Sequence, residues 1–494
     1  MTLWRMGAVE AAGLIRRGEL RAAELVGACL SRLKDKEKEI HAFLKVDEAG
    51  SLTQAAAIDN LVREGSDPGP LAGIPVAVKD NICTKDLRTT CASRILKDFD
   101  PIYDATAIQK LRRAGAVILG KTNLDEFGMG SSTENSAFGP TRNPWDETRV
   151  PGGSSGGSAA ALCAGMAPLA LGTDTGGSVR QPAAFCGVTA FKPSYGAVSR
   201  YGLVAFASGF DTMGSMARGV ADCLQLYNVI CGPDSMDSTS APDSTPINLN
   251  SLRGPVADLV LGLPRRWIEE GCNREVFDIY ENTVRVLKES GVRFQEIDMP
   301  KPDHAVSCYY ILTDAEASSN LARYDGVRFG YRAADGEALE SLESLYKHTR
   351  GKGFGPEVKR RVILGSYLLS AGYCDAYYLR AQKIRGWVKE SLTRAFERVS
   401  ALLLPTSPTP AFKLGERIKQ PLQMYLSDLF TVSANLSGAP ALAFPAGFTQ
   451  NNLPVGLQLM GRPGEEEHWI RPAHLLEQTL QLAQIAPDKP ALGD

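Results

Sequence analysis

Two glycine- and serine-rich blocks constrain this chain more than any other feature of its sequence. The first reads Gly-Gly-Ser-Ser-Gly-Gly-Ser over residues 152–158, and the second reads Gly-Thr-Asp-Thr-Gly-Gly-Ser over residues 172–178. Small hydroxyl residues set among glycines bury little apolar area and cost backbone entropy, so they are poor material for a hydrophobic core. Glycine also permits unusual backbone angles and leaves N–H groups accessible to a reacting atom. The two blocks therefore predict a functional site.

Length and composition limit the class of protein. A chain of 494 residues is long enough for two domains, but no linker rich in proline, serine or charge divides it, so we expect one domain over residues 1–494. The net charge of −2, with both signs mixed, argues against a broad nucleic-acid-binding surface. No apolar run approaches the length of a membrane span, and the N-terminus lacks the pattern of a signal peptide. The ten cysteines include no C-x-x-C pair, which indicates reduced cysteines and a cytoplasmic location.

Alternating apolar strands and amphipathic helices predict an α/β fold with a largely parallel or mixed sheet. We expect N-terminal helices over about 7–64, a core over about 70–235, and further sheet and pocket elements over about 255–485. The individual helices are expected at about 7–34, 47–64, 104–114, 158–167, 273–290, 357–398 and 465–483. The strands are expected at about 73–79, 116–119, 168–172, 258–263, 292–297, 402–404, 441–444 and 455–460.

Two short motifs point to other functions. Residues 115–122 match the phosphate-binding pattern G-x-x-x-x-G-K-[ST], but Ala-Val-Ile-Leu fills the loop position, so the segment reads as a strand. Residues 152–156 match the nucleophile pattern G-x-S-x-G, which requires a histidine base further along the chain. None of the later histidines lies in a glycine-rich or loop motif that would present a catalytic imidazole: His304, His348, His468 and His474. The histidine mechanism therefore has little support.

A serine nucleophile can instead use lysine as its base, provided that burial holds the lysine largely neutral. Lys79 is a candidate because an apolar strand that contains Ile74, Val76 and Val78 leads directly into it. The alternative is that Lys79 ends the strand and extends its ammonium group to water. The strand alone does not decide between these two interpretations.

Taken together, the segments 73–81, 150–158 and 173–180 closely resemble the amidase signature family, and the likeness extends from about residue 5 to about residue 485. The resemblance implies a large mixed β-sheet core covered by helices on both faces. It also implies that Ser178 is the nucleophile, that Ser154 bridges on a cis peptide bond, and that Lys79 is the base. The backbone N–H groups of a glycine-rich turn would hold the oxyanion: those of Thr175, Gly176, Gly177 and Ser178.

Within the family, the stretches 125–146, 315–323 and 353–361 look most like the glutamine-hydrolysing subunit of a tRNA-dependent amidotransferase. That resemblance implies that Arg361 binds the α-carboxylate of glutamine, that Asp428 binds its α-amino group, and that Tyr309 lines the pocket. A bidentate arginine and an acidic partner suit an amino-acid zwitterion. Without the resemblance, Arg361 reads as part of a solvated basic face, and Arg360 is the fallback for the same role.

The implied function is hydrolysis of glutamine, with the ammonia used to convert Glu-tRNA(Gln), or Asp-tRNA(Asn), to the amide form. The resemblance implies a heterotrimer with B and C subunits, in which the B subunit binds most of the mischarged tRNA and uses ATP and Mg²⁺. No cofactor, metal or membrane is expected for this chain itself. The alternatives are a free-standing amidase that acts on another carboxamide, an ATP-binding protein that uses residues 115–122, and a non-catalytic scaffold. The scaffold is disfavoured because Lys79, Ser154 and Ser178 are all present.

Overall fold

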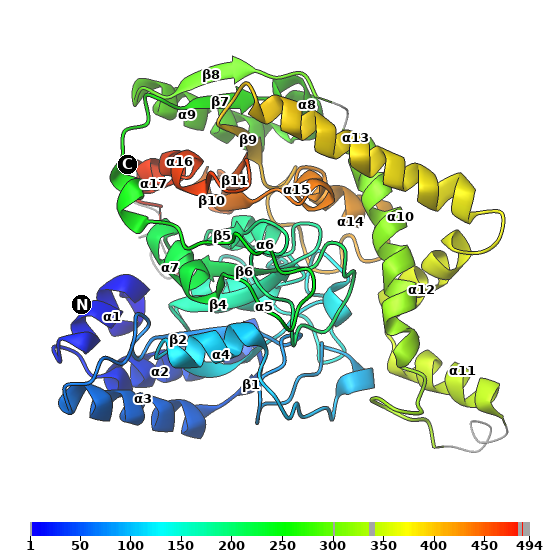
Figure 1. Cartoon of the computed structure of the whole chain (residues 1–494), viewed down its shortest axis with the longest axis horizontal. Coiled ribbons are helices and arrows are strands. Elements are labelled where there is room, and N and C mark those ends of the chain that lie inside the picture. The colour runs from blue at the N-terminus through cyan, green and yellow to red at the C-terminus, as the bar shows by residue number, and fades with distance from the viewer. Residues whose placement is uncertain (1, 300–301, 335–340, 483–486, 488–494) are drawn as a thin grey trace.

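A single mixed sheet of eleven strands forms the centre of the computed structural model, which describes residues 2–299, 302–334, 341–482 and 487 (Figure 1). The strand order is β1-β3-β2-β4-β6-β5-β10-β11-β9-β7-β8. The expected α/β fold, with helices on both faces of a large mixed sheet, is confirmed. The strands are β1 (Phe43–Val46), β2 (Pro75–Lys79), β3 (Val117–Thr122), β4 (Leu169–Asp174), β5 (Thr189–Lys192), β6 (Thr212–Ala217), β7 (Val260–Leu263), β8 (Arg293–Glu296), β9 (Ala401–Pro405), β10 (Ala441–Phe448) and β11 (Pro454–Gly461).

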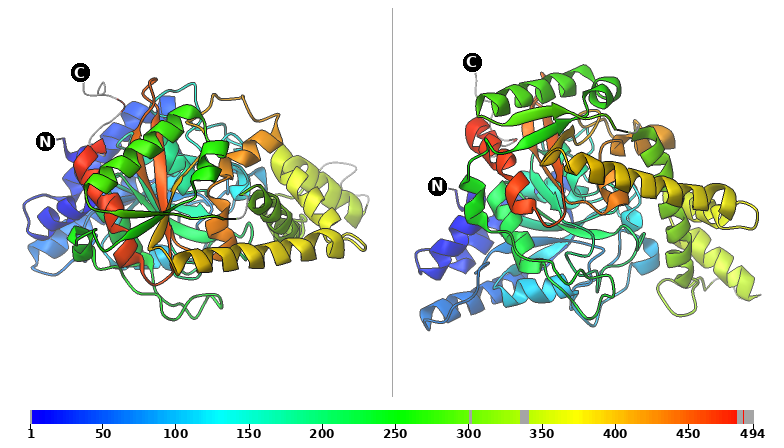
Figure 2. Two further views of the ribbon diagram at one scale, coloured as in Figure 1. Left: turned by 90° about the horizontal axis from the view of Figure 1, so that it is seen from above. Right: turned by 45° about the horizontal axis from the view of Figure 1, so that its top comes forward.

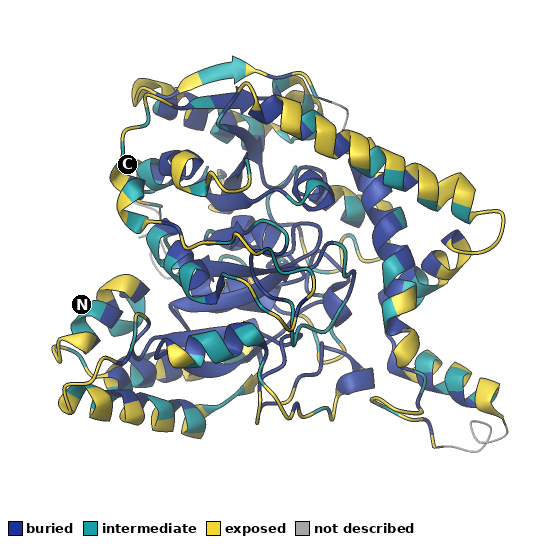
Figure 3. Ribbon diagram, in the orientation of Figure 1, coloured by how far each residue is buried: buried dark blue, intermediate teal, exposed yellow. Residues whose placement is uncertain are grey.

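Helices pack around this sheet, and the four helices α10–α13 lie together along one side of the molecule (Figures 1 and 2). Inner helices such as α5 and α6 are buried along their whole length, whereas the outer helices show exposed faces (Figure 3). The helices are α1 (Ala8–Arg16), α2 (Ala22–Ile40), α3 (Glu48–Arg63), α4 (Thr106–Arg113), α5 (Gly156–Cys163), α6 (Arg180–Cys186), α7 (Val220–Ile230), α8 (Arg265–Gly271), α9 (Arg274–Glu289), α10 (Pro302–Asn320), α11 (Leu342–Gly353), α12 (Pro356–Leu368), α13 (Leu379–Phe396), α14 (Pro421–Tyr425), α15 (Val432–Ser437), α16 (Glu466–Trp469) and α17 (Arg471–Leu480).

Three of the expected helices are each divided in the structure, and the one expected at 465–483 is α16 followed by α17. The helix expected at 7–34 is α1 followed by α2, because Gly18 adopts a left-handed φ of 74° and the carboxylate of Asp59 caps the backbone N–H groups of Ala22 and Ala23. The helical region expected at 357–398 is likewise divided into α12 and α13, with Gly372 at a φ of 83° between them. The last helix ends at Leu480, and residue 483 of its expected range lies outside the described residues.

The order of the central strands brings the two glycine-rich blocks together. Strands β2 and β4 are parallel neighbours, so their carboxyl ends lie at the same edge of the sheet. Lys79 is the last residue of β2, and the second block begins within β4 and continues beyond Asp174. The first block leads into α5, which packs against both strands. Segments that are up to a hundred residues apart therefore meet at one edge.

The segment that matches the phosphate-binding pattern is not a phosphate-binding loop. Residues 117–122 form β3, and every one of them is buried. The amine of Lys121 donates to the carbonyl oxygen of Ile82 at 2.8 Å and to the hydroxyl of Thr89 at 2.7 Å, and it lies 3.1 Å from the carboxylate of Asp80. A lysine enclosed in this way is unable to reach a nucleotide phosphate. The expectation that this segment is a strand is confirmed.

We predict that Lys121→Met lowers the free energy of unfolding by about 3–5 kcal/mol, because it leaves the carboxylate of Asp80 buried without its cation. Urea unfolding measures the change, and Lys85→Met, at an exposed position, is the control with an expected change within about 0.5 kcal/mol. ATP should leave the unfolding midpoint of the wild-type chain unchanged. A midpoint that rises with ATP and loses this rise in Lys121→Met would instead support nucleotide binding at this segment.

Candidate active site

Lys79 lies at the end of β2 and is completely buried. Its amine nitrogen Nζ lies 2.7 Å from Oγ of Ser154, 2.8 Å from Oγ of Ser155 and 2.8 Å from Oγ1 of Thr173. Burial lowers the pKa of Lys79 to about 7, although the carboxylates of Asp125, Asp174 and Asp211 act in the opposite direction. Near neutral pH, a large fraction of this lysine is therefore uncharged and able to accept a proton. The structure favours a base over a strand-end lysine in water.

Ser154 follows a cis peptide bond with Gly153 in a tightly enclosed turn. The N–H of Gly153 donates to the side-chain oxygen of Gln181 at 2.9 Å, which joins the first glycine block to α6. A Cβ atom on Gly153 would lie 2.2 Å from the carboxylate of Asp125. Glycine is required here by close packing, and this packing holds Ser154 against Lys79. Gly128 lies close to the hydroxyl of Ser154, since a Cβ atom on Gly128 would be 3.7 Å from it.

The hydroxyl of Ser178, unlike that of Ser154, is not held by a hydrogen bond to another described residue. Its side chain is 8% exposed, and its Oγ forms no hydrogen bond with any described residue. The backbone places it beside the other two members, because the N–H of Ser155 donates to the carbonyl oxygen of Ser178 at 3.0 Å. An unengaged hydroxyl beside a serine–lysine pair is what a nucleophile requires.

The turn before Ser178 supplies fewer free amides than expected. The N–H of Gly177 donates to the carboxylate of Asp174 at 2.8 Å, so it is not available to an oxyanion. The N–H groups of Thr175, Gly176 and Ser178 have no partner among the described residues, and these three remain candidates. The sequence-based prediction included all four because a carboxylate acceptor within the same turn is not apparent from glycine spacing.

A buried ion pair between Arg180 and Asp174 stabilises this turn. The Nε and Nη2 atoms of Arg180 donate to the two carboxylate oxygens of Asp174 at 3.0 and 3.1 Å, and the amide of Asn435 donates to the same carboxylate at 2.9 Å. Burial by itself would raise the pKa of Asp174, but the cation of Arg180 overrides it and holds this pKa at about 2. Asp174 therefore stays charged and keeps the turn in place at any physiological pH.

Arg361 lies on α12, and the structure buries it against aromatic side chains of the predicted glutamine pocket rather than on a solvated face. It is 2% exposed, its Nε donates to Glu357 at 2.8 Å, and its guanidinium lies over the rings of Phe206, Tyr310 and Tyr425. Its two terminal nitrogens form no hydrogen bond within the described part of the chain. This free fork is suited to a carboxylate.

The predicted partner for an amino group, Asp428, is also buried. Its carboxylate accepts hydrogen bonds from the hydroxyls of Ser131 at 2.8 Å and Tyr310 at 3.1 Å. Burial raises the pKa of Asp428 to about 7, and a bound ammonium group would favour its charged form. Arg361 is paired with Glu357 rather than with Asp428, so its two terminal nitrogens are not used by Asp428.

Tyr309 connects this pocket to the turn of Ser178. A Cβ atom on Gly176 would lie 2.4 Å from the ring of Tyr309, so the ring rests directly on the glycine backbone. The prediction that Tyr309 lines the site agrees with this position. Sequence reasoning did not find Glu357, Ser131 or Tyr310, because their roles appear only once distant segments are packed together.

Arg360, the fallback for Arg361, is unsuited to the pocket. Its side chain is 40% exposed, and it pairs with Oε2 of Glu357.

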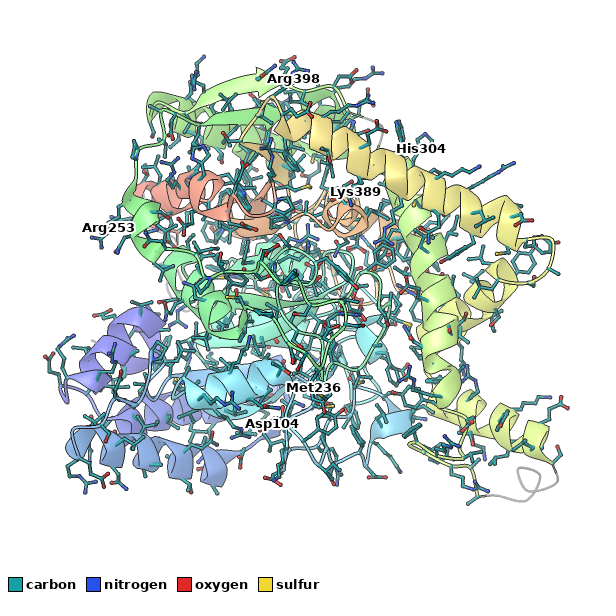
Figure 4. The ribbon with its side chains drawn as sticks, viewed as in Figure 1. Asp104, Met236, Arg253, His304, Lys389 and Arg398 are labelled. Atoms are coloured by element: carbon teal, nitrogen blue, oxygen red, sulfur yellow. The ribbon has the colours of Figure 1, made fainter. Side chains whose placement is uncertain are left out.

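The histidines do not lie where a base for the serine nucleophile would be needed. His304 lies at the exposed start of α10, at the edge of the molecule (Figure 4). The other histidines bond elsewhere, to Pro140, Ser344, Arg471 and Glu477. No described group of three or more His, Cys, Asp or Glu side chains is arranged to hold a metal ion.

Comparison with known proteins agrees with this geometry. The model of the amidase family matches residues 24–470. The chain belongs to the amidase family. It is 51% identical to the A subunit of glutamyl-tRNA(Gln) amidotransferase of Carboxydothermus hydrogenoformans over 99% of this chain and 100% of that protein. The corresponding protein of Heliobacterium modesticaldum is 49% identical over 99% of each chain.

Solved structures of the amidase family share the whole fold. The structure of the A subunit of glutamyl-tRNA(Gln) amidotransferase from Thermotoga maritima superimposes with a TM-score of 0.80 at 40% identity, covering 96% of this chain and 95% of that one. The native peptide amidase of Stenotrophomonas maltophilia also gives a TM-score of 0.80, at 29% identity, over 96% of this chain and 97% of that one. The fold is therefore common to enzymes with different amide substrates, and the substrate must be argued from the pocket.

We predict that amide hydrolysis by this chain rises with pH through a midpoint of about 7. Protonation of Lys79 below its pKa removes the base, whereas deprotonation above it restores the base. The initial rate of ammonia release from about pH 5.5 to 9 measures this dependence. Asp428→Asn, which removes a group of the predicted glutamine pocket whose pKa is also raised to about 7, should raise KM and leave the midpoint of kcat in place. A kcat that is flat across the whole range would contradict a role for Lys79 as base.

We predict that Arg361→Lys raises KM for glutamine by about 10- to 100-fold with a small change in kcat. Lysine removes the bidentate fork and its stacking on the tyrosines, and a hydrogen bond to a charged group contributes about 1.5–3 kcal/mol. Arg360→Lys, one position away and outside the pocket, is the matched control and should keep KM within about twofold. Equal effects of the two variants would place the glutamine carboxylate elsewhere.

Proposed function

We propose that this chain is the glutaminase subunit of a tRNA-dependent amidotransferase, in which it hydrolyses glutamine and supplies ammonia to an acceptor on a partner. The observation that carries the proposal is the buried pair of Arg361 and Asp428 beside the Ser178 turn. The terminal nitrogens of Arg361 and a separate carboxylate, near the turn of a nucleophilic serine, match a small zwitterion that bears a side-chain amide. Relatives that are about half identical over their full length bear the name of such a subunit.

The proposed chemistry uses the proton path from Ser178 through Ser154 to Lys79. Oγ of Ser178 attacks the carboxamide carbon, its proton passes to Ser154, and the proton of Ser154 passes to the neutral amine of Lys79. The free N–H groups of the turn stabilise the oxyanion, and one such donor typically contributes about 3–4 kcal/mol. The C–N bond then breaks as the relay returns a proton to the leaving nitrogen, which departs as ammonia. Water hydrolyses the acyl-enzyme through the same relay in reverse.

The partners and cofactors belong to the proposal as well. We infer a heterotrimer with B and C subunits, in which the B subunit holds most of the mischarged tRNA and uses ATP with Mg²⁺, while this chain needs no cofactor of its own. The near-neutral net charge of −2 supports a chain that carries few tRNA contacts. None of the ten cysteines forms a disulfide with another described residue, which supports a cytoplasmic location. None of the described helices has the length and apolar character to cross a membrane.

The surface of α12 and α13 also supports a partner. Residues 362–379 contain a single charged residue, Asp375. Large apolar side chains are exposed along this segment and into α13, with Ile363 exposed to 68%: Ile363, Leu364, Tyr367, Leu369, Tyr373, Tyr377, Leu379 and Trp387. Contiguous apolar surface with abundant tyrosine and few charges is typical of interfaces. The same helix carries Arg361, so a partner that covers this surface would lie beside the source of ammonia.

The test is ammonia release from free glutamine by the chain co-expressed with its B and C partners, beside Ser178→Ala. We expect release that increases when mischarged tRNA and ATP are added, and a loss of at least about 1,000-fold in Ser178→Ala. Ammonium chloride should restore amidation of the tRNA by the Ser178→Ala complex, because only the ammonia supply is removed.

Other outcomes would overturn the proposal. If the chain hydrolysed other carboxamides but not glutamine, it would be a free-standing amidase, a class that includes the structurally similar peptide amidase. Wild-type activity in Ser178→Ala would exclude the serine relay altogether. Failure of ammonium chloride to restore amidation would mean that the substitution disturbs more than the supply of ammonia.

A further inference from the structure

Three hydroxyl oxygens lie closest to the amine of Lys79, ahead of the carbonyl oxygen of Thr173 at 3.4 Å, but a neutral amine has only two N–H groups and one lone pair. The oxygens belong to Ser154, Ser155 and Thr173, and all lie 2.7–2.8 Å from Nζ. Catalysis requires the lone pair to face Ser154, since this hydroxyl must deliver its proton to Nζ. The two N–H groups must then point at the other two oxygens. The groups that accept these two N–H hydrogen bonds decide whether the lone pair of Lys79 faces Ser154.

Ser155 is fixed as an acceptor by its own hydrogen bonds. Its hydroxyl proton is donated to the carbonyl oxygen of Thr173 at 3.1 Å, and its oxygen accepts from the N–H of the same residue at 3.2 Å. Its proton is therefore not available to Nζ. One N–H of the lysine amine is directed at Ser155.

Thr173 takes the second N–H. Its Oγ1 accepts from Nζ of Lys79 at 2.8 Å and from the amide of Asn81 at 3.0 Å. Asn81 is 4% exposed, and its amide oxygen has no partner among the described residues, so this side chain has no other hydrogen bond to hold it. Asn81 follows β2 two positions after Lys79, whereas Thr173 lies within β4. The two parallel strands thus bring the amide of Asn81, the hydroxyl of Thr173 and the amine of Lys79 into one chain of hydrogen bonds.

We propose that Thr173, held by Asn81, and Ser155 are positioning residues that receive the two N–H groups of neutral Lys79 and thereby direct its lone pair at Ser154. When the proton of Ser154 arrives, Nζ becomes an ammonium with three N–H groups and three oxygen acceptors already in place. The proton therefore moves without reorientation of the lysine. This inference rests on the proposed relay through Ser154 and Lys79.

The test uses Thr173→Val, which keeps the shape of the side chain and removes its oxygen. In the complex with B and C subunits, we expect kcat for glutamine hydrolysis to fall by about 10- to 100-fold, since a misdirected base loses much of its contribution. KM for glutamine should stay within about twofold, because Arg361 and Asp428 are untouched. The low-pH limb of kcat should also move to lower pH, because the ammonium form of Lys79 loses an acceptor and its pKa falls.

Conservative and control variants separate positioning from general disruption. Thr173→Ser keeps the oxygen and should retain kcat within about threefold, and Asn81→Ala should reduce kcat in the same direction as Thr173→Val. Thr122→Val is the control. Thr122 is also buried and lies opposite Lys79 in the pairing of β3 with β2, but its hydroxyl is hydrogen-bonded to Ser158. Removal of this hydroxyl should leave kcat within about twofold.

Each result has one meaning. A Thr173→Val enzyme with wild-type kcat and an unmoved pH limb, beside an inactive Ser178→Ala, overturns this inference and leaves the proposed function standing. An active Ser178→Ala overturns the proposed function first. A fall in kcat that is equal in Thr173→Val, Thr173→Ser and Thr122→Val, with no shift in pH, overturns positioning in favour of a structural role.

Discussion

The removal of Lys79 from water is the constraint on which the rest of this structure depends. An isolated ammonium in a protein interior is costly, and the chain lowers that cost by surrounding Nζ with hydroxyl oxygens instead of carboxylates. A carboxylate within contact distance would hold the amine in its charged form and remove the base. The nearest acids act only over a distance, and each is held by other groups: Asp125 by backbone N–H groups, and Asp174 by Arg180. Burial lowers the pKa of Lys79 to about 7, and this separation keeps the acids from raising it to its usual value.

The glycines around the site serve close packing more than flexibility. Gly153 lies against the carboxylate of Asp125, Gly176 against the ring of Tyr309, and Gly177 against the side chain of Thr431. In each case a Cβ atom would meet its neighbour at less than 2.5 Å, which no small rearrangement accommodates. The glycine-rich blocks are therefore among the most tightly enclosed segments of the chain, in agreement with their uniform burial (Figure 3). A relay that moves protons over single hydrogen bonds requires this rigidity.

The sequence predicted those residues of the site that lie within short, contiguous motifs. Lys79 ends an apolar strand, and Ser154 and Ser178 lie in short motifs, so local pattern and family resemblance were enough to find them. The supports of these residues were not predictable in this way: the hydroxyl of Ser131 reaches Asp428 from 297 positions away, and Tyr425 reaches Glu357 from 68. The same limit explains the fold, in which strand and helix types were mostly predicted. The break between α1 and α2, by contrast, depends on a cap from Asp59, which lies on a third helix.

Asp428 and the turn before Ser178, which are predicted to contact the substrate and the oxyanion, share one hydrogen-bonded framework. The hydroxyl of Thr431 donates to the carbonyl oxygen of Gly176 at 2.6 Å and also lies 3.1 Å from that of Asp428. Nη1 of Arg180 donates to the carbonyl oxygen of Thr431 at 3.1 Å, and the same guanidinium holds Asp174 beneath the turn. Asp428, the predicted contact for an amino group, and the turn predicted to hold the oxyanion are thus attached to one threonine and one arginine. The backbone carbonyl groups of Asp428 and Gly176 are therefore held by the same hydroxyl, and neither position is supported independently of the other.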